Sequence, residues 1–165
     1  MTPAEVQKRL DSLYDELTSE FVPLYKAVDD MRTVMFERIF ESFLNQDGQK
    51  IPLPARRGGN YNTPYSPGYA RFKELRKNPL ELTGFLRNNF AGEPLTTDGL
   101  NCGIGFNATE YGKAQSLQYG KEVNPVYDSF RGYGIIFQPT EDEQAEMLAY
   151  HQQLLAEAIE NSLGS

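Results

Sequence analysis

The chain contains one cysteine, Cys102, and one histidine, His151, the two side-chain types that most often supply a nucleophile and its base. A thiolate activated by an imidazole is the nucleophile of many hydrolases. Cys102 lies among alternating apolar residues, and His151 lies at the edge of the apolar face of a predicted helix. These settings are those of packed side chains, and no third group that would orient the histidine stands out. A small hydrolase using Cys102 and His151 stays an alternative, but we expect no enzyme and no catalytic residue.

Other short motifs also lack a chemical context. Gly103 and Gly105 are too few for a dinucleotide-binding fingerprint, which needs three glycines between a strand and a helix. A single cysteine excludes an intrachain disulfide and any zinc site built from several cysteines. Asn107 and Thr109 match the glycosylation pattern, but the first residues show no secretion signal, so we interpret the match as chance. We therefore expect no metal and no cofactor.

Charge is distributed unevenly along the chain. Residues 50–90 carry eight basic and two acidic side chains, a net charge of +6. Residues 1–49 carry five basic and ten acidic side chains, and residues 91–165 carry three and eleven, giving −5 and −8. A basic segment between acidic ones indicates local polyanion binding, docking onto the acidic face of another copy, or an ordinary solvated surface.

Residues 46–69 are rich in proline, glycine and asparagine and predict a long loop. Arg56 and Arg57 form its predicted tip with two glycines, and tyrosines follow at intervals. Arginine and tyrosine are favoured in protein interfaces, and basic residues with aromatics also bind nucleic acid. We favour an interface over a solvated loop, and a solvated loop over a nucleic-acid-binding module. The candidate interface residues are Arg56, Arg57, Tyr61, Tyr65, Tyr69, Arg71, Lys73 and Arg87.

The two ends of the chain predict helices. Thr2 and Glu5 form a capping box around Pro3, and an apolar stripe from Val6 to Phe43 continues through Pro23. This pattern predicts one long kinked helix, or two helices nearly in line, ending near residues 45–48. A second capping box, Thr140 with Glu143, opens a C-terminal helix that ends near Asn161. A stripe this long must lie on a sheet, on the C-terminal helix or on a neighbouring subunit.

The middle of the chain predicts short strands and helices. Alternation from Leu100 to Phe106 predicts a strand, and Asp98–Gly99 is a tight-turn signal that two short strands could flank. Residues 111–119 predict a short helix or irregular turn closed by Gly120, and residues 135–137 a strand or a tucked-in segment. The predicted fold is α+β, with a long N-terminal helix and a C-terminal helix packed on a small, mainly antiparallel sheet, and a long Pro/Gly-rich loop. We expect one domain over 1–165, divided into 1–45, 46–69, 70–137 and 140–162, and no membrane span.

Several short motifs resemble one protein family. Ser66-Pro67 and Tyr69 with Arg71 and Lys73 are similar to its S-P-x-Y segment, and Leu82, Thr83, Gly84 and Leu86 to its T-G-x-L signature. Further similar positions are Gln46-Asp47-Gly48, Tyr111, Gly120 and Thr140. On these residues the chain resembles the tail-completion or virion-morphogenesis proteins of tailed bacteriophages, which include the Mu G-like and HK97 gp10-like groups.

The resemblance implies a structural protein of the phage neck, without catalysis. It implies a homo-oligomeric ring, commonly hexameric, that joins the head connector or head-closure protein to the tail tube within the virion after assembly in the host cytoplasm. Genome DNA would pass through the lumen without specific binding, because an acidic lumen does not adhere to phosphates. The alternative is a nucleic-acid-binding module that uses the basic segment 50–90.

Overall fold

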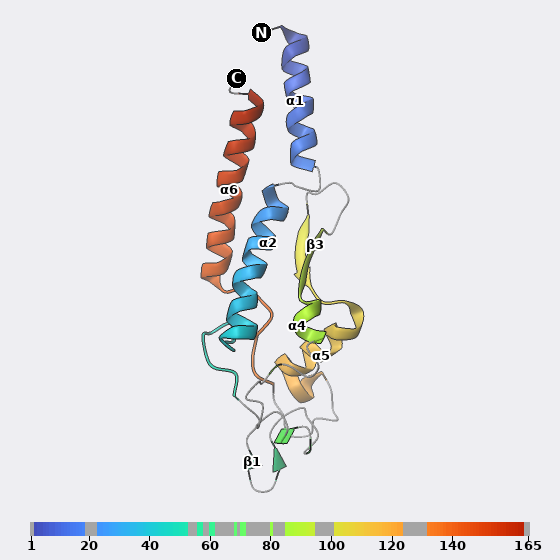
Figure 1. The fold of residues 1–165 in the computed structure, drawn as a ribbon, viewed down its shortest axis with the longest axis vertical. Coiled ribbons are helices and arrows are strands. Elements are labelled where there is room, and N and C mark those ends of the chain that lie inside the picture. The colour runs from blue at the N-terminus through green and yellow to red at the C-terminus, as the bar shows by residue number, and fades with distance from the viewer. Residues whose placement is uncertain are drawn as a thin grey trace. The chain divides into compact units, whose positions relative to one another are not determined.

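Helices make up most of the described chain (Figure 1). The computed structural model describes residues 2–18, 23–52, 56–57, 60–61, 68, 70–71, 80, 85–94, 101–123 and 132–163. The helices are α1 (Pro3–Thr18), α2 (Pro23–Phe36), a π-helical turn (Glu37–Glu41), α4 (Phe85–Asn89), α5 (Ala108–Tyr119), a 3-10 turn (Gly120–Glu122) and α6 (Glu141–Leu163). The strands are β1 (Arg56–Arg57), β2 (Asn60–Tyr61), β3 (Ala91–Pro94) and β4 (Cys102–Gly105).

The predicted α+β fold, with helices packed on a small antiparallel sheet, is wrong. The described strands form only two separate pairs, β1 with β2 and β3 with β4, and the rest of the described chain is mostly helical. The alternating segment does form a strand, but β4 is four residues long. A two-stranded ribbon is too narrow to carry long helices. Where the structure gives helix packing, helices pack on helices, as α1 does on α6.

The chain divides into two compact units. Unit 1 comprises Met1–Val34, Gly92–Ile104 and Glu141–Ser165, and unit 2 comprises Met35–Ala91 and Gly105–Thr140. Each unit is built from segments far apart in the sequence. The expectation of one domain over 1–165 stays a prediction.

Unit 1 contains the two terminal helices. The predicted capping box is confirmed, since the Thr2 amide donates to Glu5 Oε2 at 2.6 Å and the Glu5 amide donates to Thr2 Oγ1 at 3.3 Å. Pro23 begins α2, a position where proline costs no hydrogen bond. The N-terminal region thus holds two helices, one of the two predicted forms. The helix predicted over 140–162 is confirmed as α6, and α1 packs along it, beginning where α6 ends (Figure 1).

Unit 2 has a core of phenylalanine rings. Phe40 lies 5.2 Å from Phe36 and 5.8 Å from Phe90, measured between ring centroids. Phe106 lies 5.4 Å from Phe90 and 4.9 Å from Phe137. Tilted and edge-to-face pairs at these separations add to the stability gained from burial. The cluster draws on the end of α2, the residue after α4, the residue after β4 and the segment before α6.

Two polar side chains hold the segment that leads into α6. Gln118 Oε1 accepts hydrogen bonds from the amides of Ile136, at 2.9 Å, and Phe137, at 2.8 Å. The Arg38 guanidinium donates to the carbonyls of Leu44, Ile136 and Gln138. Ile136 is fully buried and belongs to no strand. Residues 135–137 are therefore the tucked-in segment of the two predicted forms.

A tight polar turn follows the π-helical turn. Asn45 is buried, and its Oδ1 accepts from the amides of Asp47, at 3.0 Å, and Gln49, at 2.8 Å. Gly48 has a φ of 72°, in the region that glycine adopts without strain. This turn lies at the end of the helical region that the apolar stripe predicted.

Candidate functional site

The apolar stripe of α1 is not buried. No residue from Thr2 to Asp15 is buried, although α1 packs along α6. Val6, Leu10 and Tyr14 follow one another at intervals of four, which places them on one face of the helix. They are 40%, 47% and 64% exposed. Pairing with one helix therefore leaves Val6 and Leu10 of the predicted stripe in contact with water, with Tyr14 beside them, whereas Leu13 is half-buried.

α6 also exposes large apolar side chains. Leu148 and Ile159 are 52% and 45% exposed, and their separation of eleven positions corresponds to about three helical turns, so they share a face. Ala158 and Glu143 are buried on another side of the helix. α6 carries six acidic residues and no lysine or arginine. The exposed apolar side chains of α6 thus lie on a strongly acidic helix.

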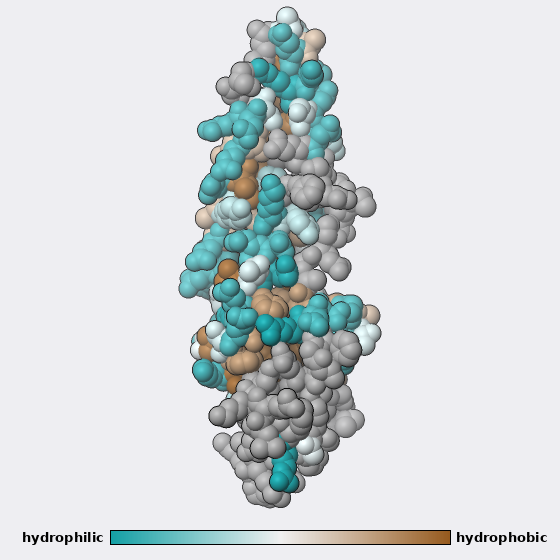
Figure 2. Space-filling model, in the orientation of Figure 1, coloured by the Kyte–Doolittle hydropathy of each residue, from teal (hydrophilic) through white to brown (hydrophobic). Residues whose placement is uncertain are grey.

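We call Val6, Leu10, Tyr14, Leu148 and Ile159 the terminal-helix surface. Over the terminal helices the face seen in Figure 2 is mainly hydrophilic, with apolar side chains exposed between the polar ones. Single exposed apolar residues are ordinary on protein surfaces, but repeated ones at helical spacing on two paired helices indicate a contact surface. The chemistry available here is binding, by apolar burial at a surface surrounded by carboxylates.

The structure brings two of the predicted interface residues together. Arg56 pairs with Tyr61, and Arg57 with Asn60, in an antiparallel strand pair, and the two glycines of the predicted loop tip lie outside the described residues. Arg71 is exposed in a short helical segment. Tyr65, Tyr69 and Lys73 lie outside the described residues. An interface at these positions stays a prediction.

Arg87, also a predicted interface residue, has partners within unit 2. Its Nη2 lies 3.1 Å from Glu41 Oε1, and its guanidinium carbon lies 4.9 Å from the centre of the Phe36 ring. An arginine over an aromatic ring gains a cation–π attraction, and the carboxylate fixes its orientation. These contacts give Arg87 a role in packing α4 against the end of α2.

The cysteine has the environment of a structural side chain. Cys102 lies in β4 and is half-buried. Burial raises the pKa of its thiol; a hydrogen bond with the Gly103 backbone acts in the opposite direction, and the nearby carboxylate of Asp29 adds to the increase. Nucleophilic cysteines have a lowered pKa, because the thiolate is the reactive form. His151 is half-buried in α6. The thiol's environment argues against the hydrolase alternative.

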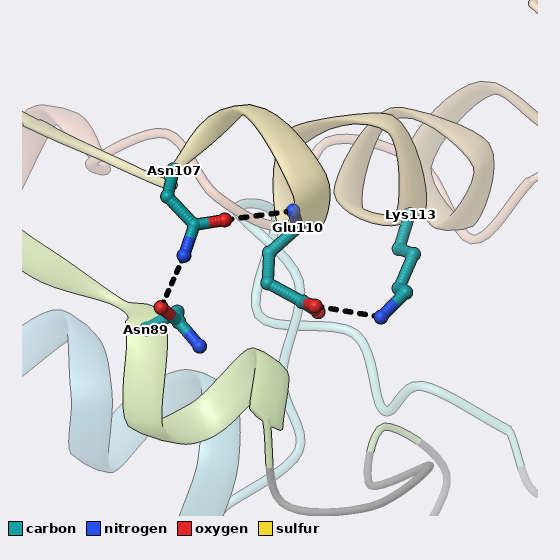
Figure 3. Close-up of polar contacts among 4 residues, drawn as sticks. All are labelled: Asn89, Asn107, Glu110 and Lys113. Carbon is teal, nitrogen blue, oxygen red and sulfur yellow. Dashed lines mark hydrogen bonds and ion pairs between the residues drawn. The ribbon is translucent and has the colours of Figure 1, made fainter.

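A polar cluster at the start of α5 was not predicted (Figure 3). Asn107 caps the helix, accepting from the Glu110 amide at 3.0 Å, and its Nδ2 donates to Asn89 Oδ1. The Glu110 carboxylate is buried, and its Oε1 accepts from Lys113 Nζ at 2.6 Å. Its Oε2 has no hydrogen-bond partner among the described residues. The N-x-x-E pattern at 107–110 is a helix-start signal that could have revealed this cluster.

Glu110 has a structural explanation. A carboxylate in the first turn of a helix is stabilised by the positive end of the helix dipole, and the ammonium of Lys113 adds a charge-assisted hydrogen bond. Within the described part of the chain, no group of three or more His, Cys, Asp or Glu residues could hold a metal ion. In the same part, no helix is long and apolar enough to cross a membrane.

No family model, no curated protein and no solved structure matches the chain. The expected resemblance to phage neck proteins therefore stays a prediction. Of the T-G-x-L segment, Leu86 is buried in α4, and residues 82–84 lie outside the described residues. Of the S-P-x-Y segment, Arg71 is described, and Ser66, Pro67, Tyr69 and Lys73 are not.

Proposed function

We propose that this chain is a structural subunit of the neck of tailed bacteriophages, a tail-completion or tail-terminator-like protein without catalytic activity. It would join the head connector to the tail tube. The observation that carries the proposal is the exposed apolar stripe of α1, where Val6, Leu10 and Tyr14 remain accessible in an isolated copy. A surface of this kind gains free energy when another protein covers it.

The proposed assembly is a homo-oligomeric ring, hexameric as the resemblance implies. Closed rings form when one patch of a subunit binds a different patch of the next, and this chain carries both an acidic helical surface and a basic segment. The subunit would reside in the virion, after assembly in the host cytoplasm. DNA would pass through the lumen without specific binding, since the chain as a whole has a net charge of −7.

The test is the mass of the protein alone and with its neighbours in the virion. Native mass spectrometry and light scattering are run on the purified chain, on the chain with the connector protein, and on the chain with assembled tail tubes. We expect a ring alone or a ring captured on one of the two partners. A chain that stays monomeric in all three samples contradicts the proposal.

The second candidate function is nucleic-acid binding through residues 50–90. The net charge of +6 on this segment favours it, as does the hairpin that carries Arg56 and Arg57. Binding of labelled double-stranded DNA is followed by fluorescence anisotropy as salt is raised. An affinity that falls steeply with salt and with Arg56→Gln/Arg57→Gln supports this function. No binding at low salt rules it out.

A further inference from the structure

α6 exposes one continuous face of small and apolar side chains. Leu148 and Ile159 are exposed, and four further residues at intervals of three or four positions are exposed beside them. This spacing places all six on one side of the helix. Three of the four further residues are alanines, whose small side chains let another helix approach closely. We call this side the α6 face; its residues are Ala145, Leu148, Ala149, Gln152, Ala156 and Ile159.

Carboxylates run along one edge of the α6 face. Asp142, Glu146 and Glu160 each lie three or four positions from one of its alanines, so they are neighbours of the face on the helix surface. All three are exposed, and among the described residues no ion pair involves them. α6 contains no lysine or arginine that would neutralise them. The α6 face is therefore bordered by negative charge that its own helix does not offset.

The charge around the α6 face favours a basic occupant. Unit 1 has fifteen acidic and four basic side chains, a net charge of −11. A second α6 would bring like charges together, and α1 of another copy carries four acidic and only two basic residues. A helix with an apolar stripe and flanking lysines or arginines instead supplies both the apolar area and the positive charge that match this face.

We propose that the α6 face binds a basic amphipathic helix of another protein. The inference rests on the proposed function, since it gives the chemistry of one neighbour that the chain joins in the neck. Apolar burial over Leu148, Ile159 and the alanines supplies affinity. The carboxylates of Asp142, Glu146 and Glu160 attract the lysines or arginines of the partner and exclude acidic helices.

Three synthetic peptides test this contact, each about six helical turns long, the length of α6. The first has leucines at helical spacing and lysines elsewhere, and the second has glutamates in place of the lysines. The third has the leucines and lysines of the first in an order without helical spacing. Binding of each labelled peptide to the full chain is measured by fluorescence anisotropy. The first is expected to bind at least about tenfold more tightly than the other two, and more weakly as salt is raised.

Two variants of the chain locate the contact. Leu148→Ser/Ile159→Ser removes apolar area from the α6 face and is expected to weaken binding of the first peptide by about tenfold or more. Glu146→Gln/Glu160→Gln removes two carboxylates from its edge and is expected to weaken binding at low salt and to reduce the salt dependence. All four positions are exposed, so circular dichroism and thermal unfolding are expected to show the wild-type fold.

The matched control is Glu37→Gln/Glu122→Gln. It removes two exposed carboxylates from unit 2 and changes the net charge of the chain by the same amount as Glu146→Gln/Glu160→Gln. This control is expected to bind the first peptide as the wild type does. An equal loss in both variants would mean that binding follows the total charge of the chain, which contradicts a site on α6.

The outcomes separate this inference from the proposed function. Preference for the first peptide, with losses in both α6 variants and none in the control, supports the contact. Equal binding of the first and third peptides, or α6 variants that bind as the wild type does, contradicts it and leaves a neck ring intact. Leu148→Ser/Ile159→Ser that weakens self-association but not peptide binding assigns the face to a second copy, which also contradicts it. A chain that is monomeric alone, with connectors and with tail tubes contradicts the proposed function, whatever the peptides do.

Discussion

The core of unit 2 and helix α1 of unit 1 bury their apolar side chains to very different degrees. In unit 2, Met35, Ile39 and Leu80 are completely buried, and Phe40 and Phe90 are 2% and 3% exposed. In unit 1, Val6, Leu10 and Tyr14 of α1 are each at least 40% exposed. Both regions have apolar residues at regular spacing. The difference indicates that unit 2 completes its core within one chain, whereas α1 leaves apolar side chains exposed that the proposed assembly would cover.

The largest expected effect comes from opening the core of unit 2. Phe40→Ala removes a ring that contacts Phe36, Phe90 and Phe137. We expect a loss of about 3–5 kcal/mol in the free energy of unfolding, from lost burial and the cavity left behind. Urea denaturation of the monomeric chain measures it. The matched change in unit 1, Tyr14→Ala, is expected to cost less than about 0.5 kcal/mol because its site is exposed. Similar losses in the two variants would remove the contrast between the units.

The next largest loss of stability is expected from a substitution at a backbone position in unit 2. Gly132 has a φ of 84°, and a Cβ there would lie 1.9 Å from the carbonyl oxygen of Gln118. Gly132→Ala therefore combines backbone strain with a clash against helix α5. We expect a loss of at least about 2 kcal/mol in unfolding free energy.

Gly112 provides the matched control for this substitution. It lies within α5, and a Cβ built there meets nothing within 4 Å. Gly112→Ala is expected to raise the unfolding free energy by about 0.5–1 kcal/mol, since alanine is the better helix former. Thermal unfolding of the two single variants gives the sign of each. A harmless Gly132→Ala would mean that residues 132–134 do not pack on α5 as the structure places them.

The sequence predicts local features such as the starts and ends of helices. It does not predict which face of each helix is buried. The Thr2–Glu5 capping box and the bounds of α6 follow from contacts between near neighbours, so the sequence predicts them. The sheet was predicted wrongly because the turn signal at Asp98–Gly99 indicates two short strands, and nothing local specifies whether further strands join them into a sheet that helices can pack on. The stripe on α1 was recognised as needing a cover, but whether α6 covers it depends on contacts between distant segments. No sequence pattern predicted that Gln118 and Arg38 bind the backbone of the segment before α6, because these partners lie far along the chain.

A smaller effect is expected at the start of α5 in unit 2. Asn107→Ala removes the side-chain oxygen that accepts from the Glu110 amide. We expect a loss of about 1 kcal/mol in unfolding free energy, the usual value of a helix cap. Asn107→Ser keeps a capping oxygen and is expected to recover most of this, although it loses the contact with Asn89. Chemical denaturation of both variants tests the cap, and an equal loss in both would place the energy in the Asn89 contact.

The smallest effect on stability is expected where the effect on assembly is largest. Leu10→Ser changes a side chain that is 47% exposed on α1. We expect the unfolding free energy of the monomer to change by less than about 0.5 kcal/mol, since little apolar surface is lost from the core. Self-association, measured by sedimentation velocity, is expected to weaken by about tenfold, because serine removes apolar area that the next copy would cover. Ala4→Ser is the control, an exposed position on the side of α1 opposite the stripe. If Leu10→Ser instead destabilised the monomer by as much as Phe40→Ala, the stripe would belong to the chain's own core, and unit 1 would be as complete as unit 2.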